Sequence, residues 1–203
     1  MKTLLISIVL FATFLTLSCR QSSDSKSQTL LTNKDSLVKT DQVDSIGAII
    51  LKVDFKIKAK GEDLKTFEDG FIPWISIFDP KAQLGSLLDA DKIVLEFTTA
   101  NIIIDYPLNF PDTFKIKTTG QGFSRKQLIL EISNRYHEIY KLEESTATTK
   151  TLPTDKRGGL INRNETNGKF GVCCHDITDL DLSEIEVHKN SKGQITLTLG
   201  VES

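Results

Sequence analysis

One long amphipathic helix, predicted between residue 124 and about residue 144, places the strongest constraint on the fold of this chain. Ser124 is a favoured N-cap residue, and Gln127 follows at the spacing of a capping box. Phe123 and Leu128 flank this start at the spacing of a hydrophobic staple. The apolar face continues at helical spacing through Ile132, Tyr136 (or Arg135), Ile139 and Tyr140. A helix of this kind is buried along that face against another layer of the domain.

Alternating apolar and polar residues on both sides of the helix predict that this other layer is an antiparallel sheet. From Leu51 to Lys60 the apolar residues alternate with Asp54 and four lysines, as in a strand with one buried and one solvated face. Further strands are predicted at 93–97, 101–106, 114–117, 182–188 and 194–199, the first three as antiparallel neighbours and the last two as a hairpin. Pro73 limits the apolar stretch 71–78 to an edge strand or an extended segment. The expected fold class is α+β, an antiparallel sheet of about five to six strands with one long helix packed on it.

The N-terminus resembles the signal peptide of bacterial lipoproteins. Lys2 precedes an apolar run, 4–17, that is too short to cross a bilayer but has the length of a secretory signal. Ser18-Cys19, with Leu17 and Leu15 upstream, is similar to a lipobox, although Thr16 stands where an aliphatic residue is usual. The resemblance implies removal of residues 1–18, acylation of Cys19 including palmitate, and a lipid anchor in the cell envelope. Arg20 in place of aspartate favours the outer membrane in that family.

Composition divides the chain after the signal into a flexible tether and one domain. Residues 19–45 are too polar to form a core, whereas 46–203 contain the strand and helix patterns. Within the domain, 145–169 is poor in hydrophobic residues and is predicted as a mobile insertion, with an ordered binding loop as the alternative. The formal net charge of −2 gives no basic surface for nucleic acid.

The polar cluster Cys173-Cys174-His175-Asp176, continuing to Asp179, is the main candidate for chemistry. Adjacent cysteines do not readily ligate one tetrahedral ion, and no second pair of ligands follows, so no metal or other cofactor is expected. The two cysteines can be free or can form a vicinal disulfide in an oxidising envelope. Alternatively, the imidazole of His175 and the carboxylate of Asp176 form a hydrogen-bonded corner that leads into the last hairpin.

Several short motifs are similar to those of a family of uncharacterised bacterial proteins. They are Asp105-Tyr106-Pro107-Leu108, Gly122-Phe123-Ser124-Arg125, Ile139-Tyr140 with Glu143-Glu144, and His175-Asp176 with Asp179-Leu180. The similarity covers residues 93–203, and Cys173-Cys174 replaces a Trp-Gly pair common before the His-Asp of the family. Because that family has no assigned activity, the resemblance implies nothing about mechanism.

The absence of a familiar enzyme signature favours a binding function over catalysis. The leading hypothesis is a lipid-anchored envelope module that contacts the membrane through Cys19 and binds an envelope or secreted protein. The alternative is a small-ligand binder or hydrolase that uses His175, Asp176 and Asp179 beside the 145–169 segment. The alternative requires these three side chains to converge in one pocket.

Overall fold

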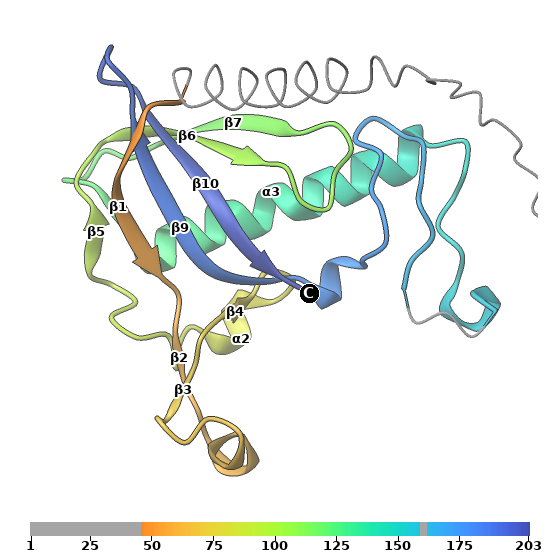
Figure 1. Ribbon diagram of the computed structural model, residues 1–203, viewed down its shortest axis with the longest axis horizontal. Coiled ribbons are helices and arrows are strands. Elements are labelled where there is room, and N and C mark those ends of the chain that lie inside the picture. Colours follow the sequence, from red (N-terminus) through yellow and green to blue (C-terminus); the bar gives the residue numbers. More distant parts are fainter. Residues whose placement is uncertain (1–45, 159–161) are drawn as a thin grey trace, which may run out of the picture. The chain divides into compact units, whose positions relative to one another are not determined.

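A computed structural model describes residues 46–158 and 162–203, and it confirms the predicted α+β fold (Figure 1). The predicted signal peptide, the lipidated Cys19 and the tether lie outside the described residues. Among the described helices, none is long and apolar enough to cross a membrane.

The main sheet has six strands and is antiparallel except at one pair. Its order is β1 (Ala48–Asp54), β9 (Asp181–Lys189), β10 (Ile195–Glu202), β6 (Thr99–Ile104) and β7 (Asp112–Lys117), and β4 (Ile75–Ser76) also pairs with β9. The predicted hairpin is confirmed as β9–β10. Strands β10 and β6 are parallel, so the sheet is mixed rather than wholly antiparallel.

The helix α3 (Arg125–Thr146) begins as the capping box predicts. The Ser124 hydroxyl accepts from the Gln127 amide at 3.2 Å, and the Gln127 side chain accepts from the Ser124 amide at 2.9 Å. Leu128, Ile129, Ile132, Tyr136 and Ile139 are buried along one face of α3. They share one core with buried residues of the sheet, among them Ile102, Leu182, Ile185 and Leu197. The helix therefore forms the second layer of the domain against the sheet.

The strand predicted from Leu51 to Ala59 is divided in two. β1 ends at Asp54, and β2 (Ile57–Lys58) pairs with β3 (Phe71–Ile72) in a separate two-stranded sheet. The backbone stops pairing with β9 after Phe55, because residues 56–58 form backbone hydrogen bonds with residues 86–88 instead. In one of these bonds the Lys58 amide donates to the Ser86 carbonyl. The alternation itself is preserved, since Val53, Phe55, Ile57 and Ala59 are buried, while Leu51 is 42% exposed.

The prediction that 93–97, 101–106 and 114–117 are antiparallel neighbours is half right. β6 and β7 pair, but β5 (Ile93–Leu95) pairs with β8 (Phe123–Ser124) immediately before α3. Gly122 permits this pairing, because a Cβ atom there would lie 2.2 Å from the Leu95 carbonyl oxygen. Short turns complete the chain: η1 (Gly61–Lys65), α2 (Pro80–Gln83), η2 (Thr154–Lys156) and η3 (Ile177–Asp179).

The two sides of the segment 145–169 are joined by hydrogen bonds in its described part. The Asn164 side chain accepts from the Leu152 amide at 2.7 Å and donates to the Lys150 carbonyl at 3.1 Å. The Asn167 side chain accepts from the Thr149 amide at 2.7 Å. The mobility of this segment stays a prediction.

Candidate functional site

A buried glutamate on α3 organises the loop that leads to the predicted cluster. Glu143 is 0% exposed, and its carboxylate accepts from the Thr166 hydroxyl and from the amides of Gly168 and Phe170, each at 2.7 Å. Burial alone would raise the pKa of Glu143, but the hydrogen bonds from Thr166, Phe170 and Gly168 outweigh burial and hold the pKa below its usual value. Glu143 therefore remains a carboxylate that fixes the backbone of residues 166–171.

Two tyrosines one helical turn apart connect α3 to both loops of the site. The Tyr136 hydroxyl donates to the Tyr106 carbonyl, and the Tyr140 hydroxyl donates to the His175 carbonyl, each at 2.8 Å. Burial raises the pKa of both phenols, so they remain neutral donors at physiological pH. These two hydrogen bonds from α3 thus fix the backbone at residues 106 and 175.

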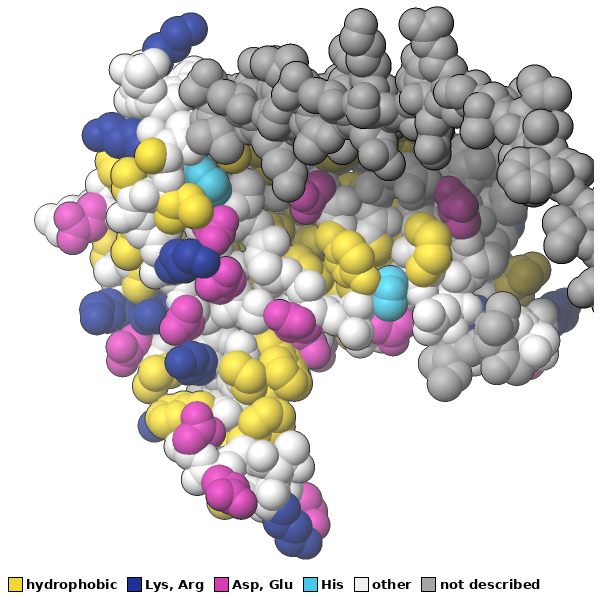
Figure 2. Space-filling model, in the orientation of Figure 1, with side chains coloured by type: hydrophobic (Ala, Val, Ile, Leu, Met, Phe, Trp, Pro, Cys, Tyr) yellow, Lys and Arg dark blue, Asp and Glu magenta, His cyan; other side chains and the backbone are white. Residues whose placement is uncertain are grey.

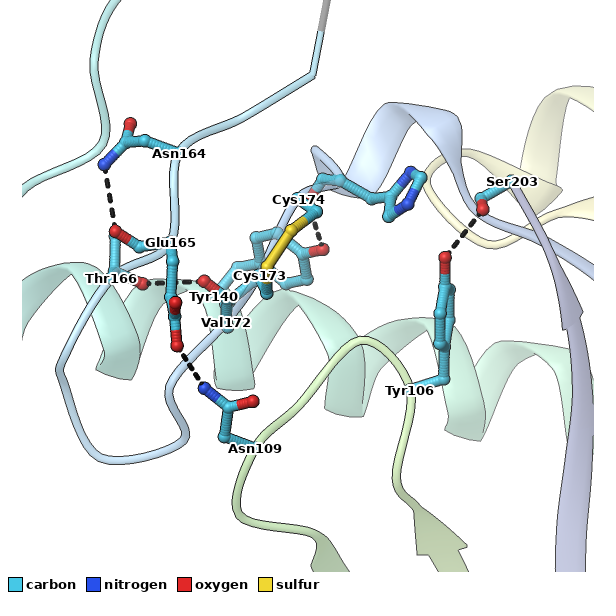
Figure 3. Close-up of a disulfide and its surroundings, with 11 residues drawn as sticks. Tyr106, Asn109, Tyr140, Asn164, Glu165, Thr166, Val172, Cys173, Cys174 and Ser203 are labelled. Atoms are coloured by element: carbon cyan, nitrogen blue, oxygen red, sulfur yellow. Dashed lines mark hydrogen bonds between the residues drawn. A yellow bond between two sulfur atoms is a disulfide. The ribbon is translucent and has the colours of Figure 1, made fainter. Parts of the chain in front are cut away.

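Cys173 and Cys174 form a disulfide at the surface between these loops (Figure 3). The Cys173 amide donates to the Pro107 carbonyl at 3.0 Å. Both cysteines are half-buried. They form a cavity of about 270 Å³ together with Asp105, Tyr106, Pro107, Leu108, Asn109 and His175. The rings of Tyr106 and His175, which both line this cavity, lie 5.6 Å apart.

The three predicted site residues do not converge in this cavity. Only His175 lines it. The Asp176 carboxylate accepts from Arg157 at 2.6 and 3.2 Å, and the Asp179 carboxylate accepts from the Asp176 amide at 3.1 Å. Asp176 and Asp179 thus form the capping box of η3, at the start of β9. The predicted pairing of the His175 imidazole with the Asp176 carboxylate is wrong, because this carboxylate binds Arg157 and the Asp176 amide binds Asp179.

Sequence reasoning missed three residues of this region, Glu143 as an anchor, Arg157 as a partner and Arg163. The guanidinium of Arg163 lies 5.1 Å from the ring of Tyr140. Arg163 is only 6% exposed, and its Nε and Nη2 have no hydrogen-bond partner among the described residues. Glu143 appeared in the sequence only within the motif similar to the uncharacterised family, which gave it no role, and the arginines lie in a polar segment without periodicity. In the described ranges, no group of three or more histidine, cysteine, aspartate or glutamate side chains is placed to hold a metal.

A second candidate site is an apolar groove beside β1. Figure 2 shows hydrophobic side chains over this part of the sheet, between charged ones. The groove has a volume of about 510 Å³ and is lined by Ile50, Leu51, Lys52, Val53, Lys92, Ile93, Val94, Glu96, Phe97 and Arg125. Among the described strands, β1 pairs only with β9, and on its other edge Arg125 donates to the Asp54 carbonyl at 2.9 Å. The sequence pattern marked β1 as a strand but did not show that this end of it would be uncovered.

Comparison with known proteins finds no matching family model, no similar curated protein and no similar solved structure. Several residues of the motifs similar to an uncharacterised family serve the fold here. Ser124 caps α3, Tyr140 and Glu143 form hydrogen bonds to the backbone of His175 and Phe170, and Leu180 is buried. The function of the chain therefore has to be argued from its own surface.

Proposed function

We propose that this chain is a lipid-anchored envelope protein whose domain binds an extended segment of a partner protein along β1. The observation that carries the proposal is the exposure of Ile49, Ile50 and Leu51, which are 49%, 48% and 42% exposed on an open strand edge. Ile93, which is 40% exposed, extends the same apolar surface from β5. Contiguous exposed hydrophobic residues of this kind are typical of interaction sites.

The open edge supplies the backbone part of the recognition. An unpaired strand presents N–H and C=O groups on which a partner strand can pair, and adjacent pockets receive its alternate side chains. Soluble proteins usually protect such edges with charged residues. Lys52 and Asp54 do so at the C-terminal end of β1, but residues 48–51 carry no charge.

A bulge in β1 displays one residue in particular. Ile49 stands opposite His188, and Leu51 stands opposite the next residue, Val187, so that Ile50 has no partner in β9. Ile50 lines the groove together with Leu51 and Phe97. Lys52 is paired with Glu184 and Glu186, at 3.3 and 2.6 Å, and the other charged residues that line the groove are Lys92, Glu96 and Arg125.

The predicted acylation of Cys19 would hold this groove near the membrane. One buried acyl chain gives only marginal membrane binding, whereas two or more bind firmly. A domain held in this way meets proteins of the envelope or secreted proteins that pass it, which is the partner class predicted from the sequence.

Site-specific photo-crosslinking in the producing cell tests the proposal. A photoreactive residue at position 50 should give one discrete adduct with a second protein, because that side chain would contact the bound strand. The matched control is position 64 on η1, since Leu64 is equally exposed at 49% but lies outside the groove. Adducts of the same pattern at both positions, or none at position 50, would refute a binding site on β1.

A further inference from the structure

The disulfide between Cys173 and Cys174 cannot act as a staple for the fold. A disulfide stabilises a protein mainly by closing a loop in the unfolded chain, and the stabilisation grows with the length of that loop. These two cysteines are adjacent in the sequence, so their bond encloses a single peptide unit. Its effect must therefore be confined to the local backbone.

That local effect is visible at Cys174. Its φ of +74° lies in the left-handed region, which residues other than glycine seldom adopt. The His175 amide donates back to the Cys173 carbonyl at 2.9 Å, which completes a tight turn. The two flanks of the turn are fixed, by Glu143 on the side of Phe170 and by Tyr140 on the side of His175. A change at the disulfide is therefore taken up between these anchors.

The turn also holds the arm, which we define as residues 147–158 and 162–165. Cys174 forms an isolated backbone bridge with Arg163. Two residues further along, Asp176 binds Arg157 through two hydrogen bonds, and Arg157 in turn donates to the Leu152 carbonyl at 2.9 Å. Two of the contacts that hold the arm therefore lie within two residues of the disulfide.

The disulfide is open to reagents. Cys173 and Cys174 are half-buried and line the surface cavity beside Tyr106. Figure 3 shows the bond between the two sulfur atoms beside the loop that carries Tyr106 and Asn109. A thiolate that reaches this cavity meets the disulfide without any opening of the core.

We propose that Cys173–Cys174 is a thiol–disulfide exchange site, reduced by a protein or small-molecule dithiol, whose state controls the order of the arm. A thiolate of the donor attacks one cysteine sulfur, a mixed disulfide forms, and the other cysteine leaves as a thiolate that takes up a proton. The second donor thiol, as its thiolate, then attacks the donor sulfur of the mixed disulfide. The first cysteine leaves and is protonated, and the donor becomes a disulfide. Two electrons and two protons pass from the donor to this chain.

Reduction removes the covalent restraint that keeps Cys174 at a positive φ. Without it, Cys174 relaxes toward the backbone conformations that are ordinary for a side-chain-bearing residue. This rotation displaces the backbone bridge between Cys174 and Arg163, so that the arm loses this connection. The core and the main sheet, which contain neither cysteine, are unchanged.

Hydrogen exchange of the full chain, as isolated and after treatment with dithiothreitol, tests this proposal. Thiol titration should count two additional thiols after treatment, and the mass should rise by two hydrogen atoms. Amides of the arm should then exchange at least several-fold faster, while those of β9 and β10 serve as an internal reference. The variant C173S/C174S should show the fast pattern without dithiol and should not respond to it.

Three results would overturn the proposal. The isolated protein could carry two thiols under oxidising conditions, the disulfide could resist dithiothreitol until the chain is unfolded by denaturant, or the arm could exchange equally in both verified redox states. The comparison of redox states uses the unchanged sequence, so it stands even if the double serine variant fails to fold.

Discussion

The hydroxyl of Tyr140 lies 2.8 Å from the backbone oxygen of His175, so that the buried face of α3 directly holds the residue that follows the disulfide. One helical turn further, Glu143 holds the residues that precede the disulfide, through the amide of Phe170. The same face of α3 therefore fixes both ends of the turn that contains Cys173 and Cys174.

Replacement of Tyr140 by phenylalanine should destabilise the domain by about 1–3 kcal/mol, because the His175 carbonyl loses a donor in a part-buried position. Urea denaturation measures the difference. Tyr106→Phe is the control, since the Tyr106 hydroxyl meets the Ser203 hydroxyl at the exposed surface, and its loss should change the free energy of unfolding by less than about 0.5 kcal/mol. Equal losses in the two variants would contradict the anchoring role of Tyr140.

Replacement of Glu143 by glutamine should cost about 3 kcal/mol at neutral pH. The new amide group would place a donor against the amides of Phe170 and Gly171, which already donate to this position. Glu144→Gln is the matched control, because Glu144 is an exposed neighbour, and its change should lie within about 0.5 kcal/mol.

The cost of Glu143→Gln should also depend on pH. The pKa of Glu143 is lower in the folded protein than its ordinary value of 4.5, so its stabilisation is complete above that value and is lost as the pH falls through the folded pKa. Urea denaturation from neutral pH down to acid should therefore show the wild-type and variant stabilities converging. Parallel stability curves over this range would contradict a carboxylate held ionised by its hydrogen bonds.

Replacement of Asp176 by asparagine should loosen the arm without unfolding the domain. The variant removes the negative charge that pairs with Arg157. Because this ion pair is only partly exposed, the loss should lower the free energy of unfolding by about 1–2 kcal/mol. Limited trypsin digestion should cut faster at Lys150 and Lys156. Asp155→Asn is the control on the arm itself, because Asp155 is exposed, and it should leave the cleavage rate unchanged.

Cys19→Ser should move the chain from the membrane fraction to the soluble fraction and abolish incorporation of labelled palmitate. The reason is that acyl chains contribute about 0.8 kcal/mol per buried methylene, and the variant would have none. Cys173→Ser is the matched control and should stay in the membrane fraction. Labelling that survives in Cys19→Ser would exclude the predicted anchor.

Local signals explain which parts of the fold were predictable. The start of α3 depends on Ser124 and Gln127, which are three residues apart, and the β9–β10 hairpin depends on turn residues between adjacent strands, so both were predicted. Alternation tells which face of a strand is buried but not which strand lies next to it. The pairing of β5 with β8 and the parallel pair β10–β6 were missed for this reason.

The candidate site was less predictable because its contacts are long-range. His175, Asp176 and Asp179 attracted attention as a polar cluster, but Asp176 is paired with Arg157, which lies in a segment without any periodic pattern. The hydrogen bonds of Glu143 span more than twenty residues. The groove beside β1 combines residues from β1 and β5 that only the tertiary structure brings together.

A pair of charge variants tests whether β1 and its groove form a protein-binding site. The affinity for the protein that crosslinks to position 50 should be compared in Ile50→Asp and Leu64→Asp, two residues of equal exposure. Binding at β1 predicts a loss of at least tenfold for Ile50→Asp, which corresponds to about 1.4 kcal/mol, and wild-type affinity for Leu64→Asp. Unchanged binding by a folded Ile50→Asp protein would contradict it.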